Sequence, residues 1–161
     1  MDELLDREEI RDVLLRYCRG VDRCDEELVR SVYHEDATDD HGTFKGSGHE
    51  FASVVVPMLR AQWRSTVHAL HNVSIDLDGD AAFVESGFVA THRSLTDQDP
   101  TDFVFGGRYI DRFECRDGVW KIASRLVVHD WSRLEPVGTE LDLSMFEQGR
   151  QDQTDPSYRR L

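Results

Sequence analysis

The sequence predicts a single α+β domain, in which helices from the first part of the chain pack over the concave face of a curved antiparallel sheet. Apolar residues recur at helical spacing between residues 10 and 21. From Thr66 onward the apolar period changes to two, which is typical of strands. Asp78-Gly79 and Asp117-Gly118 are signals for tight hairpins between long strands.

The first helix is predicted to begin at a capping box formed by Asp6 and Glu9 and to run for about four turns. Its apolar stripe consists of Ile10, Val13, Leu14, Tyr17, Cys18 and Val21. A second, short helix is predicted over Glu26–Val32 and a third over Glu50–Arg64. Pro57 should kink the third helix or mark a late first turn, because proline has no N–H to donate.

Turn residues between two short segments predict a small hairpin over His34–Lys45. Four long strands follow and should form a meander that twists and curls. They are expected at Thr66–Leu77, Ala81–Ser94, Asp102–Cys115 and Val119–Trp131. Gly106-Gly107, inside the third of these strands, indicates a bulge or a sharp bend. A curled sheet with helices across its concave side leaves a pocket between the two layers, where a small molecule would bind.

The hydrophobic pattern fades after Trp131. We therefore assign residues 1–131 to the body of the domain and residues 132–161 to a polar C-terminal arm of the same domain. We expect this arm to cover a neighbouring subunit or to stay mobile.

The net charge of −13, from 32 acidic and 19 basic residues, argues against binding to nucleic acid or to an anionic membrane. No apolar run approaches the roughly 20 residues that span a bilayer. The acidic start of the chain does not resemble a signal peptide, and the three cysteines suit free thiols. We therefore expect a cytoplasmic protein whose ligand is a neutral or apolar small molecule.

Asp22 is the most informative residue, because it follows Leu14 and Cys18 at four-residue steps on the inward stripe. An unpaired buried carboxylate is costly, so Asp22 should be protonated or held by a partner. The alternative is that the helix ends here and Asp22 reaches water or Arg23. His68 is the candidate partner, since a histidine oriented by a carboxylate is a competent general base near neutral pH. A histidine in a strand is otherwise a hydrogen-bonded core or edge residue, and spacing does not establish the pairing.

Tyr17 is a second candidate, because its hydroxyl could reach the same cavity and bind a carbonyl oxygen; the alternative is an ordinary core aromatic. Aromatic residues on one face of the third strand are either sheet core or the apolar wall of a pocket. These residues are Phe103, Phe105, Tyr109 and Phe113. We expect Phe103, Phe105, Tyr109 and Trp63 to contact a substrate.

No metal and no cofactor are predicted. His68 and His71 should point to opposite faces of their strand and cannot easily share one ion. A cluster of acidic and histidine residues is interpreted as a solvated turn, because its spacing matches no metal-ligand pattern. This cluster consists of His34, Asp36, Asp39, Asp40 and His41. The sequence also contains neither a glycine-rich phosphate loop nor a nucleophile elbow.

Five segments of the sequence resemble the SnoaL-like branch of the nuclear transport factor 2-like superfamily. They are IRDVLLRYCRGVD, TVHALHN, GGRYIDRFECRDGVWKI, HDW and GRQDQTDPSY. The resemblance covers nearly the whole chain, and the order and spacing of the motifs make it specific. It implies a cone-shaped fold with a deep pocket, usually in homodimers or homotrimers.

The resemblance also implies functional residues. In hexachlorocyclohexane dehydrochlorinase, an aspartate after Gly-Val and a histidine form the base dyad, and these positions match Asp22 and His68. Bile-acid 7α-dehydratase adds a tyrosine that matches Tyr17. Thr91 and His92 occupy the neighbourhood of its second aspartate, and Tyr33 is the candidate for the second tyrosine of scytalone dehydratase.

Three functions follow from this pattern. The first is a cofactor-independent lyase that eliminates water or a halide from a hydrophobic small molecule. The second is an isomerase or cyclase that uses the same base. The third is a non-catalytic binding or accessory module. Asp22 and His68 within hydrogen-bond reach inside a closed pocket would favour an enzyme, because an accessory module has no need of such a pair.

Overall fold

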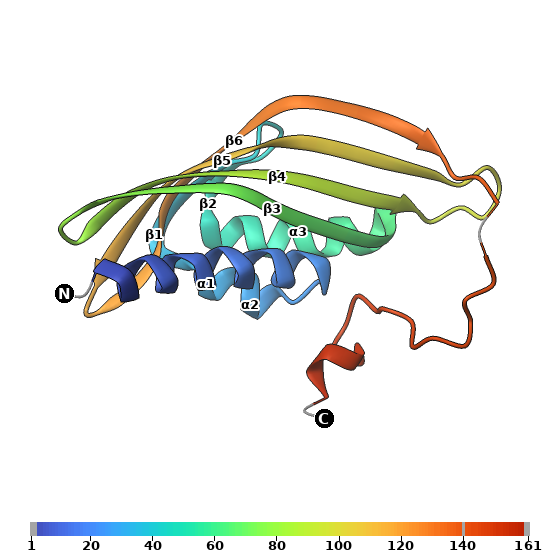
Figure 1. The fold of residues 1–161 in the computed structure, drawn as a ribbon, viewed down its shortest axis with the longest axis horizontal. Coiled ribbons are helices and arrows are strands. Elements are labelled where there is room, and N and C mark those ends of the chain that lie inside the picture. Colours follow the sequence, from blue (N-terminus) through green and yellow to red (C-terminus); the bar gives the residue numbers. More distant parts are fainter. Residues whose placement is uncertain (1–2, 140, 160–161) are drawn as a thin grey trace.

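The computed structural model describes residues 3–139 and 141–159 and confirms the α+β prediction. Three helices cover one face of a curved six-stranded sheet (Figure 1). The helices are α1 (Glu3–Asp22), α2 (Glu26–Ser31) and α3 (Gly48–Gln62). The strands are β1 (Tyr33–Asp40), β2 (Lys45–Ser47), β3 (Trp63–Asp78), β4 (Ala81–Ser94), β5 (Thr101–Arg116) and β6 (Val119–Pro136). No helix within the described ranges is long and apolar enough to cross a membrane.

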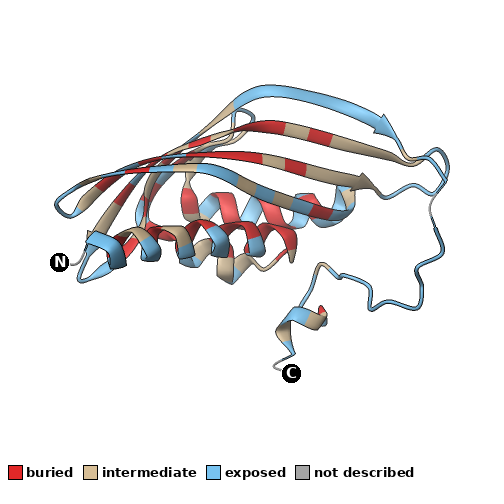
Figure 2. Ribbon diagram, viewed as in Figure 1, coloured by how far each residue is buried: buried red, intermediate tan, exposed pale blue. Residues whose placement is uncertain are grey.

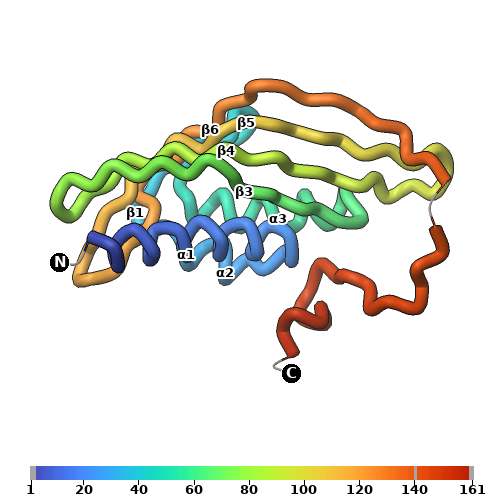
Figure 3. The backbone as a smooth tube through the Cα atoms, in the orientation of Figure 1, coloured from blue at the N-terminus to red at the C-terminus, as the bar shows by residue number. Residues whose placement is uncertain are grey.

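The strands lie in the order β2-β1-β6-β5-β4-β3. Strands β3 to β6 form the predicted meander, and Figure 3 shows how it curves over the helices. The predicted hairpin is present as β1 and β2. The sheet differs from the prediction in one respect: it is mixed, because β1 runs parallel to β6. This pairing joins segments that are far apart in the sequence, so no local turn signal indicates it.

Helix α1 buries the predicted apolar stripe, but it begins before the predicted residue. The helix already includes Glu3, so Asp6 lies inside it and the prediction of an N-terminal capping box at Asp6 is wrong. The Asp6 carboxylate is buried and accepts a hydrogen bond of 2.8 Å from the indole N–H of Trp120. A buried indole needs an acceptor, and Asp6 supplies it.

Helix α3 begins with a capping box between Ser47 and Glu50, in which each side chain accepts a hydrogen bond from the backbone N–H of the other residue. Pro57 lies well inside this helix, so it does not mark a late first turn. Its ring leaves the carbonyl of Ser53 without a helical donor. Both Pro57 and Ser53 are exposed, and water can therefore bind that carbonyl.

Strand β3 contains a bulge at Asn72, which has a φ of 50°. His71 pairs with Gly87 and Ser74 with Glu85, so β3 carries one residue more than β4 between these pairs. The extra residue changes which positions face inward. The inward residues are Thr66, His68 and Leu70 before the bulge, and Val73, Ile75 and Leu77 after it.

The bulge or bend predicted at Gly106-Gly107 is confirmed, because the pairing of β5 with β6 shifts there. Gly106 pairs with Trp131 and Gly107 with His129, so Asp130 is the extra residue. A methyl group on Gly107 would lie 2.1 Å from the carbonyl oxygen of Val128. Gly107 is therefore required by a close approach of two backbones.

Replacing Gly107 by alanine should lower the free energy of unfolding by about 1–3 kcal/mol, because the two strands must move apart. Urea unfolding followed by tryptophan fluorescence measures this change. Gly138→Ala is the matched control, because a side chain there meets no other atom within 4 Å. An equal effect of the two substitutions would contradict the close approach at Gly107.

Buried residues lie on the helices and on β4 and β5, and also on β1 and the first part of β6, whereas the last part of β6 is exposed (Figure 2). An ion pair lies inside this core: the guanidinium of Arg125 donates to both carboxylate oxygens of Asp111 at 2.8 and 2.7 Å. Neither side chain is exposed. The same guanidinium lies 4.1 Å from the ring centres of both Tyr17 and Tyr109.

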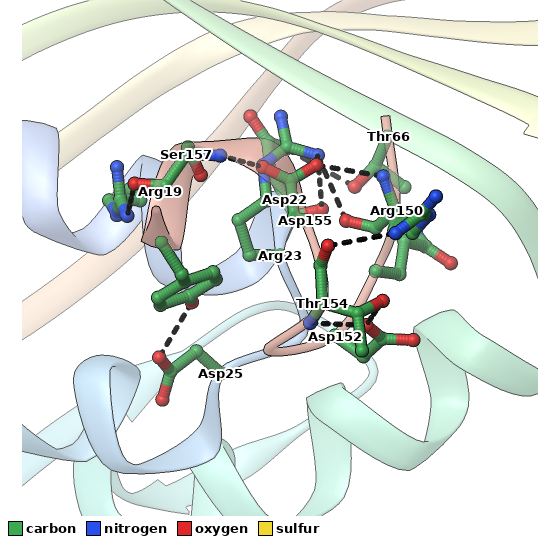
Figure 4. A network of polar contacts seen from close by, with 12 residues as sticks. Arg19, Asp22, Arg23, Asp25, Thr66, Arg150, Asp152, Thr154, Asp155 and Ser157 are labelled. Atoms are coloured by element: carbon green, nitrogen blue, oxygen red, sulfur yellow. Dashed lines mark hydrogen bonds and ion pairs between the residues drawn. The ribbon is translucent and has the colours of Figure 1, made fainter. Parts of the chain in front are cut away.

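The C-terminal arm returns to the helices of its own chain, whereas we expected it to cover another subunit or to stay mobile. Tyr158 and Gln153 both donate to Asp25, at 2.7 and 2.9 Å. Figure 4 shows the surrounding polar network, in which Arg23 lies beside Arg150 and Asp155 of the arm. Asp25 also caps α2, and its second carboxylate oxygen receives the arm. Arg23 and Arg60 donate to backbone carbonyls of the arm. These contacts depend on groups distant in sequence, so a polar composition does not reveal them.

Candidate active site

A cavity of about 340 Å³ lies between the helices and the sheet. Most of its lining is apolar, and its wall includes three of the four predicted substrate contacts, Phe103, Phe105 and Tyr109. Trp63 does not line this cavity. It packs against two residues that do, with its ring centre 6.0 Å from that of Phe103 and 5.2 Å from that of His92. Tyr17 and the histidines His41, His68 and His92 also line the cavity.

Asp22 and His68 meet at the wall of this cavity, which His68 lines and Asp22 does not. Asp22 is the last residue of α1, and His68 lies near the start of β3. Nδ1 of His68 lies 2.7 Å from Oδ1 of Asp22, and each side chain is 10% exposed. The backbone N–H of His68 and the hydroxyl of Thr66 also donate to the carboxylate, at 3.0 and 3.1 Å.

Three hydrogen bonds thus hold the Asp22 carboxylate in place. The carboxylate can only accept, so Nδ1 of a neutral His68 carries the proton and Nε2 keeps its lone pair. The alternative held that the helix ends at Asp22 and that its side chain reaches water or Arg23. The helix does end there, but the carboxylate binds His68 and Thr66. The geometry provides an oriented imidazole in an apolar cavity, which is what a general base requires.

A second histidine–carboxylate pair, which we interpreted from the sequence as part of a solvated turn, lies on another wall. That interpretation is wrong for Asp39 and His41. Asp39 is 2% exposed, and its carboxylate binds Nδ1 of His41 and accepts a hydrogen bond of 2.7 Å from Tyr33. Nε2 of His41 lies 3.1 Å from the hydroxyl of Tyr17.

The alternation of β1 is the signal that could have located this pair. Ala37 and Asp39 are buried, and the intervening residue Thr38 is exposed. Two residues further, His41 falls on the same inward side and stacks on Phe51, with ring centres 4.0 Å apart. The other members of the predicted cluster follow the expected pattern only in part. Asp36 and Asp40 pair with Arg116 and Lys45, and the buried His34 contacts the carbonyl of Glu114.

His92 is the third histidine of the cavity. Burial, aided by the nearby His68, lowers the pKa of His92 from 6.5 to about 4. Its ring is therefore neutral at neutral pH. Nδ1 of His92 lies 3.4 Å from the carbonyl oxygen of Phe103, which can only accept, so Nε2 again keeps its lone pair.

The ring of His92 should titrate near pH 4 in the folded protein, well below the ordinary value of about 6.5. Histidine NMR signals followed between pH 7 and pH 4 measure this midpoint, and the His92→Gln variant assigns the signal. His71 is the internal control, because its side chain lies on the exposed side of β3. A midpoint for His92 at or above that of His71 would contradict the effect of burial.

The arrangement of the remaining candidate ligands and thiols gives little further chemistry. As predicted, His68 and His71 diverge, and His71 lies outside the cavity. Within residues 3–139 and 141–159, no group of three His, Cys, Asp or Glu side chains is placed to hold a metal ion. Cys18, Cys24 and Cys115 are free, and burial raises the pKa of Cys18 to about 12, so this thiol is inert.

The helices, the curved sheet and the cavity between them define a domain of the nuclear transport factor 2-like fold. The profile of the SnoaL-like domain family matches residues 2–126, and the chain belongs to this family. A comparison with curated protein sequences finds no match.

Several solved structures share the fold. A type 2 hexachlorocyclohexane dehydrochlorinase is 20% identical, over 88% of this chain and 97% of its own, with a TM-score of 0.78. The type 3 enzyme from Novosphingobium barchaimii is 21% identical, over 83% of this chain and 92% of its own, with a TM-score of 0.74. A candidate scytalone dehydratase from Novosphingobium aromaticivorans is 22% identical, over 86% of this chain and 97% of its own, with a TM-score of 0.73. At these identities the likeness is one of fold.

Proposed function

We propose that the protein is a cofactor-independent lyase, which eliminates water or a halide from a hydrophobic small molecule. His68 is the general base and Asp22 orients it. The observation that carries this proposal is the 2.7 Å contact between Nδ1 of His68 and Oδ1 of Asp22 inside an apolar cavity. A non-catalytic module has no need of a carboxylate held by three hydrogen bonds beside a histidine.

The proposed reaction begins when Nε2 of His68 takes a proton from a carbon next to an activating group. The electron pair of that C–H bond forms a carbon–carbon double bond, and the leaving group departs with the electrons of its own bond. The Asp22 carboxylate stabilises the imidazolium that forms, and this interaction is strong because both side chains are largely buried. The proton then passes from His68 to the released hydroxide or to solvent, which restores the neutral base.

The substrate class follows from the walls of the cavity. Phe103, Phe105, Tyr109 and Phe88 present aromatic surface, so the body of the substrate is apolar. Tyr17 lies in the same cavity and would hold a polar group of the substrate. The dehydrochlorinases of similar fold are consistent with elimination as the chemistry, but they do not indicate the leaving group.

Product mass tests this proposal against the two alternatives. The protein is incubated with a panel of hydroxylated and halogenated steroids, polyketides and aromatic ketones that thermal shift selects as ligands. Elimination lowers the mass by one water or one hydrogen halide, and the His68→Ala variant should form none of this product. A rearranged product of unchanged mass would support an isomerase or cyclase instead. Stabilising ligands that are all recovered unchanged would support a binding module.

We also propose a cytoplasmic homo-oligomer, either a dimer or a trimer. Large apolar side chains are exposed in the middle and near the end of β6, and their burial against another copy would be favourable. They include Leu126, Trp131 and Leu134. The free thiols suit a reducing compartment. Light scattering coupled to size exclusion measures the mass in solution, and a monomer would contradict this assignment.

A further inference from the structure

Tyr17, His41 and Asp39 form a continuous chain of hydrogen bonds that the proposed reaction does not use. The hydroxyl of Tyr17 contacts Nε2 of His41, and Nδ1 of His41 contacts Oδ1 of Asp39. The side chain of Asp39 is 0% exposed, and its other oxygen accepts a hydrogen bond from Tyr33. Tyr17 and His41 line the cavity, whereas Asp39 and Tyr33 do not. Tyr17 and His41 are therefore the two residues of this hydrogen-bond network that a ligand can contact.

The direction of each hydrogen bond follows from the chemistry of the groups. The Asp39 carboxylate can only accept, so Nδ1 of His41 donates to it. Burial, although opposed by Asp39, lowers the pKa of His41, so the ring is neutral at neutral pH and Nε2 has a lone pair. The hydroxyl of Tyr17 must therefore donate to His41. Burial raises the pKa of Tyr17, which keeps the proton on the Tyr17 oxygen.

We propose that the Asp39–His41 pair makes Tyr17 a hydrogen-bond acceptor toward the cavity, so that the pocket selects hydrophobic ligands that carry a hydroxyl group. The single hydrogen of Tyr17 is already used, and only a lone pair of its oxygen remains for a ligand. This role is the opposite of the carbonyl binding that the sequence predicts for Tyr17. His41 and Asp39 act through Tyr17 and are positioning residues.

The other polar atoms of the cavity support the same selection. His68 and His92 each direct Nδ1 to an acceptor of the protein and keep a lone pair on Nε2. Of the three histidines that line the cavity, His68 and His92 thus offer acceptors to a ligand, whereas Nε2 of His41 is already used by Tyr17. That this ligand is the substrate rests on the proposed function, and the substrate of the elimination is then an alcohol or a phenol. The hydrogen-bond direction of Tyr17 does not depend on any reaction.

Two fluorescent probes of similar shape test the selection by titration. 2-Naphthol carries a hydroxyl donor, and 2-methoxynaphthalene carries only an acceptor. The full chain should bind 2-naphthol about 3- to 10-fold more tightly, the range expected for one net hydrogen bond. Equal affinities, or a preference for the methoxy compound, would overturn the proposal.

Asp39→Asn should reverse the direction of these hydrogen bonds, and asparagine has nearly the same size as aspartate. The asparagine amide donates to Nδ1 of His41, the ring proton moves to Nε2, and Nε2 then donates to the Tyr17 oxygen. The Tyr17 hydrogen becomes free to point into the cavity, so the preference for 2-naphthol should disappear. Tyr33→Phe is the matched control, because it removes a different hydrogen bond of Asp39 and keeps the carboxylate. This control should retain the preference.

Nitrogen NMR of the histidine rings detects which ring nitrogen of His41 carries the proton, and it needs no ligand. We expect the proton of His41 on Nδ1 in the natural protein and on Nε2 in Asp39→Asn. A proton on Nε2 in the natural protein, or an unchanged preference after the proton has moved, would overturn the proposal. If Asp39→Asn does not fold, His41→Phe must show the same loss, because it keeps the stack on Phe51 and frees the Tyr17 hydroxyl. Both probes are bound and not turned over, so a failure of the elimination chemistry is recognised separately from a failure of the hydroxyl preference.

Discussion

Replacement of Asp22 by asparagine should reduce kcat/KM of the elimination by about 10²- to 10⁴-fold, the range of effects for a general base. The amide of asparagine can donate to Nδ1 of His68, which moves the ring proton to Nε2 and blocks the base. The variant also lacks the negative charge that stabilises the imidazolium. Because asparagine has the same shape, the backbone N–H of His68 keeps an acceptor and the fold should be retained.

Steady-state kinetics on a substrate from the mass screen measures this loss, and thermal unfolding checks the fold. Thr66→Val is the matched control: it removes one hydrogen bond to Asp22 and leaves the contact with His68. We expect this control to keep most of the activity. The double variant Asp22→Asn/His68→Ala should be no slower than His68→Ala alone, because the two residues act as a unit. An Asp22→Asn enzyme as fast as the parent would refute the dyad.

The second large effect concerns stability. Asp111→Leu should lower the free energy of unfolding by about 3–5 kcal/mol, because it leaves the buried guanidinium of Arg125 without its anion. Among the described residues Nη1 of Arg125 has no hydrogen-bond partner, so the guanidinium depends on its two hydrogen bonds to Asp111. Denaturation in urea, followed by circular dichroism, gives the difference.

The double variant Asp111→Leu/Arg125→Met distinguishes a lost charge from a lost packing contact. Replacing both members of a buried ion pair by apolar residues is often close to neutral, so much of the stability should return. A double variant as unstable as Asp111→Leu alone would mean that volume, and not the unpaired charge, dominates. The ring of Tyr17 contacts the Arg125 guanidinium, so the affinity of the double variant for 2-naphthol also reports whether the cation keeps Tyr17 in place.

Local signals in the sequence predicted the elements of this fold well. The Asp-Gly pairs and the change of apolar period located the four strands of the meander, because hairpin geometry depends on adjacent residues. The parallel pairing of β1 with β6 and the docking of Tyr158 on Asp25 depend on residues distant in sequence. Composition and spacing contain no information about such contacts, and these features were missed.

The candidate site was predicted unevenly for the same reason. The helical stripe indicated that Asp22 faces inward, but only the family resemblance paired it with His68. The pair of Asp39 and His41 was overlooked because the surrounding residues Asp40 and Gly42 are typical of a solvated turn. The charge of Asp39 suggested a side chain exposed to water, whereas its position in the alternating pattern of β1 places it in the core.

The bulge at Asn72 has an evolutionary consequence. It divides β3 into two segments with independent registers: Thr66, His68 and Leu70 face inward in the first, and Val73, Ile75 and Leu77 in the second. His68 is the residue of β3 that lines the cavity, and it belongs to the first segment. Substitutions in that segment can therefore alter what the protein binds while the second segment continues to hold the helices and sheet together. A lineage of such proteins can acquire new ligands without first losing its stability.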